Sequence, residues 1–459
     1  MSGLCGIPMI PTMLLTTLLL ALSPQAAQPA HETSRPKYQF LRQNEDWSMY
    51  GSSVDLTETG DLSDRIKYIR LSDDGAVWLS FGGHFRARYE NWNNFNFGLN
   101  PGFSHDDDFL LTRFLLHTDL HLGSHDRIFA EGKTAQSTDR DLVGMARPLD
   151  VDSLDLQQLF WDHSLSAFGG DATLRLGRQM LLLGRQRLVS PLPWGNTLRS
   201  WDGASVFWKN DDLNVQAFWT VFDPVDIGDF NEPDTDQDFY GFYGTYKAAE
   251  GCLFDFYLLG LGREMAAFNG TAGEESRYTL GGRANGKISD DLSYDVEAAY
   301  QFGEVGTGDV NAYMVTGELA YSLAGIATDP RLRLAVDVAS GDKDPGGDVE
   351  TFNQLFPLGH AYLGFIDQVG RQNIIDLSLG GDLTFSKGWK GRIDFHQFWL
   401  MSEDDALYNA GGGVVVPGGT STSTSVGTEI DITTSYRIGR HTVVAGGVGR
   451  FFEIGRAHV

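Results

Sequence analysis

The chain has 459 residues and carries 35 Lys and Arg against 61 Asp and Glu, a formal net charge of -26. This acidic balance excludes a broad nucleic-acid surface, because phosphate binding needs clustered cations. The sequence has only Cys5 and Cys252, which excludes a disulfide scaffold and a Cys-based zinc site, and we expect no cofactor. The 55 glycines and the 12% of aromatic residues are typical of many tightly turned strands.

The N-terminal part of the chain predicts export followed by a polar extension. Residues 13–22 form an apolar run that fits the roughly 7–15 residues of a signal-peptide core and is shorter than the about 20 that a spanning helix needs. Small residues follow from Ala26 to Ala30, so we expect residues 1–27 to be a signal peptide, although no Lys or Arg precedes the apolar run. Residues 28–75 are mixed and polar, and they predict an N-terminal periplasmic extension or a plug.

Residues 76–452 are dominated by alternation of apolar and polar side chains. From Val77 to Glu90, one face carries Val, Leu, Phe and Tyr, and the other carries Ser, His, Arg and Glu. We count about seventeen such segments, each near the roughly 9–11 residues of a tilted membrane-spanning strand. The pattern predicts an all-β fold, a transmembrane antiparallel β-barrel of about eighteen strands, integral to the bacterial outer membrane. A large secreted sandwich or propeller would show the same alternation, but the strand length, the export signal and the aromatic strand ends favour the membrane.

The connections between these segments alternate in length. The short ones, at residues 123–126 and 386–388, predict periplasmic turns. The long polar ones, at residues 93–108, 340–372 and 402–426, predict extracellular loops.

The last residues of the chain predict a sequencing artefact. Residues 453–459 back-translate as GAG ATC GGA AGA GCA CAC GTC, which matches a widely used sequencing adapter. We therefore expect the gene to continue differently after Phe452 and the last strand of the barrel to be missing from this chain. One more strand would give the even number that bacterial single-chain barrels have.

Two stretches of the sequence carry a family likeness. The first holds LRLGRQ at 174–179 and WGNT at 194–197, and the second holds TFNQLFP at 351–357 and GHAY at 359–362. These motifs resemble the alginate-export family of outer-membrane proteins, over most of the mature chain. The resemblance implies a monomeric barrel in outer-membrane lipid, whose best-known type passes the polyanion alginate through an arginine-lined constriction. It also leaves room for periplasmic export components as partners.

Ten arginines are candidates for the lining of the lumen, by strand parity or by their place in the family motifs. Arg178 shares the parity of Leu174 and Leu176, so a bulge at Gly177 would be needed to turn it inward. For Arg199, the sequence supports two predictions equally: an ion pair with Asp202 and contact with a solute. Acids share the wet face, so structural ion pairs are the alternative to a net basic constriction. The candidates are Arg86, Arg88, Arg113, Arg178, Arg187, Arg199, Arg283, Arg333, Arg392 and Arg437.

Other chemistry finds little support in the sequence. It contains no nucleophile elbow, zinc-protease motif or Walker loop, so we expect no catalytic residues. The acidic loop at 342–348 fails the EF-hand spacing, because Gly346 takes the place of a ligand. Histidines at 84, 117 and 121 are predicted to bond to carboxylates in the lumen and to hold no metal.

We therefore predict an outer-membrane channel that passes an anionic, alginate-like polysaccharide or another anionic solute, with selectivity set by lumen charge. Three alternatives stay open: a general porin for small polar solutes, an outer-membrane enzyme, and an adhesion barrel whose loops do the work. A lumen of balanced charge would favour the general porin. A cluster of Ser, His and an acid that faces lipid would favour the enzyme, and a fully plugged lumen would favour the adhesion barrel.

Overall fold

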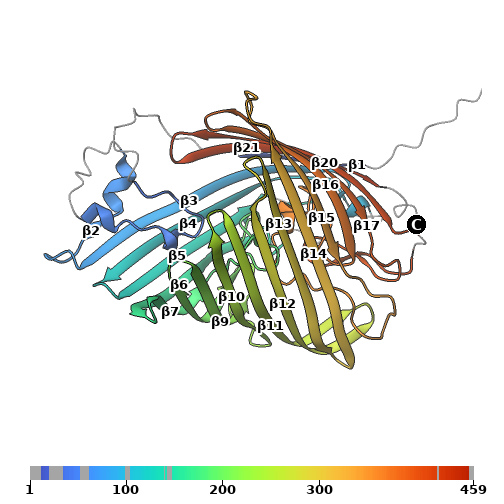
Figure 1. The fold of residues 1–459 in the computed structure, drawn as a ribbon, viewed down its shortest axis with the longest axis horizontal. Coiled ribbons are helices and arrows are strands. Elements are labelled where there is room, and N and C mark those ends of the chain that lie inside the picture. Colours follow the sequence, from blue (N-terminus) through green and yellow to red (C-terminus); the bar gives the residue numbers. More distant parts are fainter. Residues whose placement is uncertain are drawn as a thin grey trace, which may run out of the picture.

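The protein is a barrel of long, tilted antiparallel strands (Figure 1). No helix in the described part of the chain is both long enough and apolar enough to cross a membrane. Most of the predicted signal peptide, parts of the extension and residues 454–459 of the predicted artefact lie outside the described residues. The computed structural model describes residues 12–19, 35–51, 61–98, 104–138, 140–141, 147–420 and 423–453.

Seventeen wall strands follow one another from Val77 to Glu453 and correspond to the alternating segments of the sequence. They are β3 (Val77–Trp92), β4 (Asp107–Leu122), β5 (Asp126–Ser137), β6 (Asp152–Ala167), β7 (Gly170–Gln179), β8 (Ser200–Lys209), β9 (Leu213–Asp223), β10 (Gln237–Ala249), β11 (Cys252–Phe268), β12 (Thr271–Lys287), β13 (Leu292–Val305), β14 (Gly308–Ser322), β15 (Arg331–Ala339), β16 (Ile374–Ser386), β17 (Trp389–Trp399), β20 (Ser425–Ile438) and β21 (Thr442–Glu453).

The remaining elements are short. Two of them, β18 and β19, form a small hairpin in the loop between β17 and β20. The short elements are β1 (Thr12–Leu19), β2 (Ile69–Arg70), β18 (Leu407–Tyr408), β19 (Val414–Val416) and the 3-10 helices η1 (Arg42–Asn44), η2 (Ser48–Gly51), η3 (Leu62–Ile66), η4 (Phe95–Gly98) and η5 (Gly359–Ala361).

The seam of the barrel lies between β3 and β21. Strand β1 runs antiparallel to β21 over Thr12 to Leu18 and antiparallel to β3 over Thr16 to Leu19, so it bridges the seam only in part. The two-residue β2 pairs with the other end of β3. Without β2, the nineteen-stranded sheet has eighteen strands, all antiparallel to their neighbours. Seventeen are the wall strands, and the eighteenth is β1, which lies within the predicted signal peptide and occupies the place between β21 and β3 where we expect the missing last strand.

The burial of side chains is the reverse of that in a soluble sandwich. On β13, the apolar Val296 and Tyr300 are 45% and 46% exposed, whereas Asp295 and Glu297 on the opposite face are each 6% exposed. The register carries the same alternation to the neighbouring strands. An apolar face turned outward and a charged face buried inward suit a wall between lipid and a lumen. This distribution excludes the soluble sandwich.

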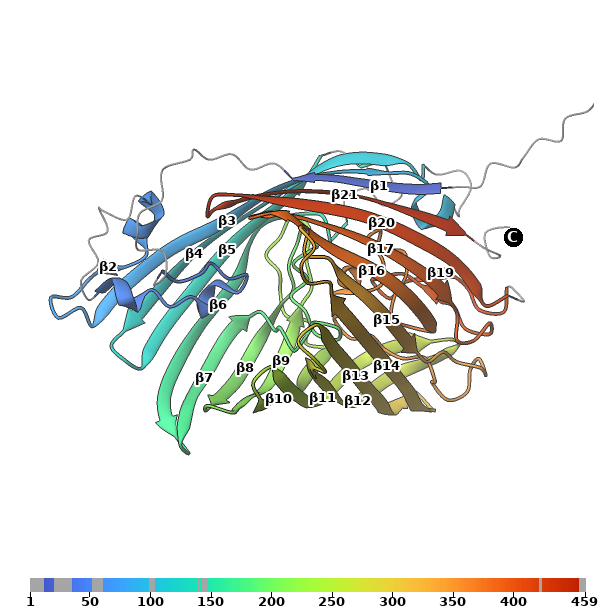
Figure 2. The same ribbon diagram turned by 45° about the horizontal axis from the view of Figure 1, so that its top comes forward.

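The long connections lie at one end of the barrel, which we call the loop end, and we call the other end the turn end. The predicted alternation in length fails between β11 and β14, since residues 269–270 and 306–307 form short turns at the loop end. Two long loops fold back into the barrel, 180–199 between β7 and β8 and 340–373 between β15 and β16 (Figure 2). They pair with each other, since Phe356 donates to the carbonyl of Leu188 at 2.8 Å and accepts from the N–H of Ser190 at 2.9 Å. The interior is therefore partly filled by these loops.

The N-terminal segment, residues 35–51 and 61–75, packs at the turn end. His441, in the β20–β21 turn, contacts Asp61 at 2.7 Å. Gln43 donates to the side-chain oxygen of Gln158 at 3.2 Å, and Leu41 packs against a cluster that contains Met180 of the loop 180–199. The segment thus reaches from the rim into the lumen, and a cavity of about 700 Å³ lies between it and the inner faces of β4 to β10.

Candidate functional site in the barrel lumen

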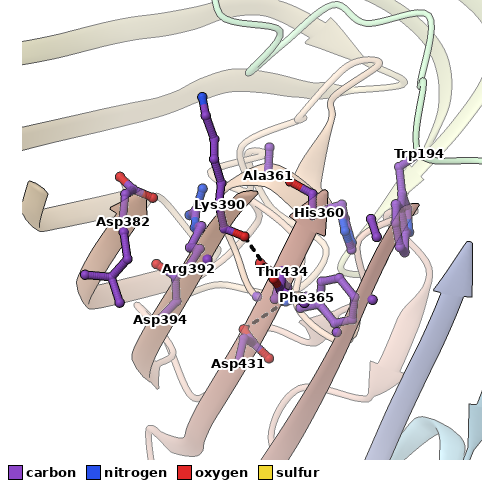
Figure 3. Close-up of a pocket in the computed structure, with 18 of the residues that line it drawn as sticks. Trp194, His360, Ala361, Phe365, Asp382, Lys390, Arg392, Asp394, Asp431 and Thr434 are labelled. Carbon is purple, nitrogen blue, oxygen red and sulfur yellow. Dashed lines mark hydrogen bonds and ion pairs between the residues drawn. The ribbon is translucent and has the colours of Figure 1, made fainter. Parts of the chain in front are cut away.

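Two cavities in the lumen meet at one pair of side chains. The turn-side cavity, about 550 Å³, lies against the inner faces of β16, β17, β20 and β21 (Figure 3). The loop-side cavity, about 230 Å³, lies between β3, the loop 180–199 and the loop 340–373. Trp194 and His360 line both cavities, so their side chains form the partition between them.

The partition is a stacked pair fixed by one carboxylate. The rings of Trp194 and His360 lie 3.5 Å apart between centroids, at 10° to one another. The indole N–H of Trp194 donates to Asp367 Oδ2 at 2.8 Å, and His360 Nδ1 lies 3.2 Å from the same oxygen. Phe365 flanks both rings, at 5.4 Å from Trp194 and 5.0 Å from His360 (Figure 3).

Three of the predicted arginines hold the backbone beneath Trp194. Arg86 donates to the carbonyls of Pro193, Trp194 and Gly195 at 3.0, 3.0 and 2.6 Å. Arg113 donates to Gly195 at 2.9 Å. The Arg88 guanidinium donates to the carbonyl of Trp194 and lies 4.0 Å from the centroid of its ring. The structure therefore brings Arg86, Arg88 and Arg113 together as anchors of the inward-folded loop.

The facing loop is anchored by Arg371, which the sequence did not indicate, and by the carboxylates of Asp337, Glu429 and Asp431, which strand parity places in the lumen. Arg371 is fully buried and donates to both carboxylate oxygens of Asp337, at 2.7 to 3.1 Å. Its other nitrogen donates to the carbonyl of Arg187 in the first loop. On β20, Glu429 and Asp431 accept the N–H groups of residues 366 and 365 at 3.0 and 3.1 Å. Both loops are thus fixed close to the partition.

Further predicted arginines lie in ion-pair networks on the wall. Arg187 contacts Asp295 and Glu297, both at 2.9 Å. Arg283 lies between Asp255 and Asp295, at 2.7 and 2.6 Å. Arg333 reaches carboxylates on two other strands, Asp382 at 2.9 Å and Asp394 at 2.8 Å. Opposite charges on neighbouring strands satisfy one another here.

Arg178 and Arg199 do not take the places that the family motifs suggested for them. The β6–β7 and β7–β8 ladders show no register shift at Gly177, so Arg178 keeps the outward parity of Leu174 and Leu176. It pairs with Asp202 at 2.8 Å, near the loop end of the wall, and does not face the lumen. Arg199 instead donates to the carbonyl of residue 357 at 2.9 Å, and burial lowers the pKa of its guanidinium to about 10.

The turn-side cavity contains the more accessible cations. Lys390 and Arg392 project from β17 toward it (Figure 3). The Arg392 side chain is 41% exposed and pairs with Asp394, and no second carboxylate partner is found for it in the described part of the chain. For Lys390, no ion pair is found with any residue that the structure describes. Asp382, Asp394 and Asp431 line the same cavity, so its charge is mixed. Arg437, also predicted, is exposed near the turn end of β20.

The loop-side cavity has its own cations. Arg88 and Arg199 line it together with Arg147, which the sequence analysis did not select. Burial alone would lower the pKa of Arg147, but its hydrogen bond and ion pair with Asp150, at 2.8 Å, raise the pKa above the ordinary value. Each cavity therefore presents a guanidinium group that is paired with a carboxylate, Arg392 with Asp394 and Arg147 with Asp150.

The prediction that the three lumen histidines bond to carboxylates is not confirmed. Two of them lie near a carboxylate without a hydrogen bond to it, and for the buried Nδ1 of His84 no hydrogen-bond partner is found among the described residues. His117 lies 3.8 Å from Glu131, and His121 lies 3.3 Å from Asp119 and stacks on Trp78. Across the described residues, no group of His, Cys, Asp and Glu is arranged to hold a metal ion.

In the sequence, Trp194 and His360 stand out only as parts of the family motifs, and Asp367 lies outside these motifs. The motifs are a signal that these positions matter, but no local pattern shows that two loops far apart in the chain stack side chains on one another. Such a contact depends on both loops folding inward.

An antiparallel wall with an apolar outside and a charged lumen defines this protein as an integral outer-membrane β-barrel channel. The sequence profile of the alginate export family matches residues 77–457, and the chain belongs to that family. No curated protein sequence matches it. The outer membrane protein opdK from Pseudomonas aeruginosa has a similar fold, with a TM-score of 0.51 and 10% identity over 82% of this chain and 97% of that chain. The structure of OpdK from Pseudomonas aeruginosa with vanillate gives a TM-score of 0.50 and 11% identity over 82% and 96%.

Proposed function

We propose that this channel passes an anionic polysaccharide of the alginate type, or another anionic solute, through the two lumen cavities. The observation that carries the proposal is the placement of Lys390 and Arg392 in the turn-side cavity, where Lys390 has no carboxylate partner among the described residues. A cation without a protein partner is available to a solute carboxylate. An arginine paired on one side only keeps donors of its planar fork for a second partner.

The path continues through the loop-side cavity. Arg88, Arg147 and Arg199 line it on the far side of the partition. A polyanion would move along such a series of sites if each bound it weakly enough to release it. The carboxylates beside these cations limit the strength of each site, because they compete for the same donors.

A general porin for small polar solutes is the second candidate. It is favoured by the acids of the turn-side cavity, Asp382, Asp394 and Asp431, which offset its cations. A lumen of balanced charge would pass small neutral and charged solutes alike.

We further propose that the N-terminal segment, 35–51 and 61–75, is a plug that narrows the turn end, as its contacts with His441, Gln158 and Met180 indicate. The turn end would then face the periplasm, where export components could deliver the solute. We propose that the barrel works as a monomer. Residues 1–27 remain a predicted signal peptide.

Flux into liposomes tests the proposed function. Short uronate oligomers should enter vesicles that contain the protein faster than neutral glucose oligomers of the same length. The variant Lys390→Glu, alone and with Arg392→Glu, should remove this preference, whereas Lys343→Glu, on an exposed loop at the other end, should not. Equal entry of both oligomers into wild-type vesicles would replace the proposal with the general porin.

A further inference from the structure

The partition between the two cavities depends on a single carboxylate oxygen. Asp367 Oδ2 accepts from the indole N–H of Trp194 and from His360 Nδ1. Where the carboxylate oxygen accepts this hydrogen bond, the histidine carries a proton on Nδ1. The Asp367 side chain is 31% exposed, and its backbone has a φ of 59°, a conformation that non-glycine residues rarely adopt. Strain of this kind is common at sites that switch.

The backbone on both sides of the partition is fixed. The carbonyls of residues 193–195 accept from Arg86, Arg88 and Arg113, and the N–H groups of residues 365 and 366 donate to carboxylates of β20. Movement of whole loops would break many of these bonds together. Rotation of the Trp194 and His360 side chains would break fewer contacts: their stacking, their bonds to Asp367 and the contacts of their rings with Arg88 and Phe365.

A solute that crosses from one cavity to the other must therefore displace this stack. We propose that Trp194, His360 and Asp367 form a latch that a sugar carboxylate opens by binding to it. The carboxylate would take the indole and imidazole N–H donors from Asp367, while the sugar ring lies against the aromatic faces. This inference rests on the proposed function, because it assumes that the solute is a uronate.

The charges around the latch favour such an exchange. Arg88 on one side, and Lys390 and Arg392 on the other, line the two cavities that adjoin the partition. They attract an anion to it. The carboxylate of the incoming sugar repels the carboxylate of Asp367. Because the Asp367 side chain is partly exposed, it can turn toward water. Charge-assisted hydrogen bonds to the incoming carboxylate replace those that are lost.

Single-channel recording of the refolded protein tests the latch, with sodium glucuronate as the probe. Glucuronate should raise the open fraction of the wild-type channel by roughly tenfold, the effect of one charge-assisted hydrogen bond. Glucose should have no effect, and acetate distinguishes a site for any carboxylate from one that also needs the sugar ring. Asp367→Ala and Trp194→Phe should each leave the channel mostly open without glucuronate, since both remove the bond and Trp194→Phe keeps an aromatic ring.

A second tryptophan–aspartate pair provides the matched control. Trp219 donates to Asp238 at 3.1 Å on the outer face of the wall, where Trp219 is 60% exposed. Trp219→Phe and Asp238→Ala remove the same kind of bond outside the lumen and should gate like the wild type. Wild-type gating in both Asp367→Ala and Trp194→Phe, or no response of the wild type to glucuronate, would overturn the latch. The same traces give ion selectivity, and a cation-selective channel whose latch still responds would contradict only the proposed function.

Discussion

Basic side chains face the lumen from two regions of the wall, β3 with β4, and β17, but they have different roles. Arg86 and Arg113 donate hydrogen bonds to the carbonyls of an inward-folded loop. Lys390 and Arg392 face a cavity and have one carboxylate partner between them in the described chain. Parity predicts that all four point inward, yet only the second pair is available to a solute. An arginine in a lumen therefore serves the loops or the solute according to what folds against it.

The largest effect is expected where an anchoring arginine is fully buried. Arg371→Ala leaves Asp337 buried without its partner, which should cost about 3–5 kcal/mol of stability. Urea unfolding followed by electrophoretic mobility measures this loss. The double variant Arg371→Ala with Asp337→Ala should recover part of it, because no charge is then left unpaired. A single variant as stable as the wild type would show that Arg371 does not anchor the loop.

Removal of an anchor from β3 should have a smaller effect on stability and a clear one on the lumen. Arg86→Ala leaves the carbonyls of residues 193–195 short of donors, at a cost of about 1–3 kcal/mol. The loop 180–199 should then become a better substrate for proteases added at the loop end. If the loop is cleaved at the same rate in Arg86→Ala and in the wild type, Arg86 does not anchor it, and the distinction between anchoring arginines and solute-facing cations fails.

Removal of a solute-facing cation should hardly affect stability. Arg392 is partly exposed and pairs with one carboxylate, so Arg392→Ala should cost only about 0–1 kcal/mol. The selectivity of the channel for anions should nevertheless fall. A variant with strongly reduced stability but unchanged selectivity would place Arg392 among the anchors.

The smallest effect concerns the N-terminal segment at low pH. Burial alone would raise the pKa of Asp61, but hydrogen bonds from Ser63 and His441 hold the pKa below its ordinary value. A lowered pKa means that the contact stabilises the segment above the ordinary aspartate pKa, about 3.9, and that this contribution is lost as the pH falls further. Hydrogen exchange of residues 35–51 should therefore accelerate below about pH 4. The variant Asp61→Asn should show this faster exchange already at neutral pH. Equal exchange rates in the variant and the wild type at neutral pH would show that Asp61 does not anchor the segment.

The wall could be predicted from the sequence because its signal is local. Each strand shows the alternation of apolar and polar side chains in its own residues, as Val77 to Glu90 do. Because every strand has lipid on one side and the lumen on the other, the same alternation stabilises all of them. The partition could not be predicted in this way. Trp194 and His360 meet only because the two loops turn inward and are anchored by β3, β4, β15 and β20. Arg178 shows that parity was the better guide than the family motif, since it keeps the outward parity of its strand and pairs there with Asp202.

The reversal potential of the channel under a salt gradient in planar bilayers tests the central claim most directly. The wild-type channel should prefer anions, and the double variant Lys390→Glu with Arg392→Glu should lose or reverse this preference. A wild-type channel that prefers cations, or that shows no preference, would contradict the assignment of an anionic solute.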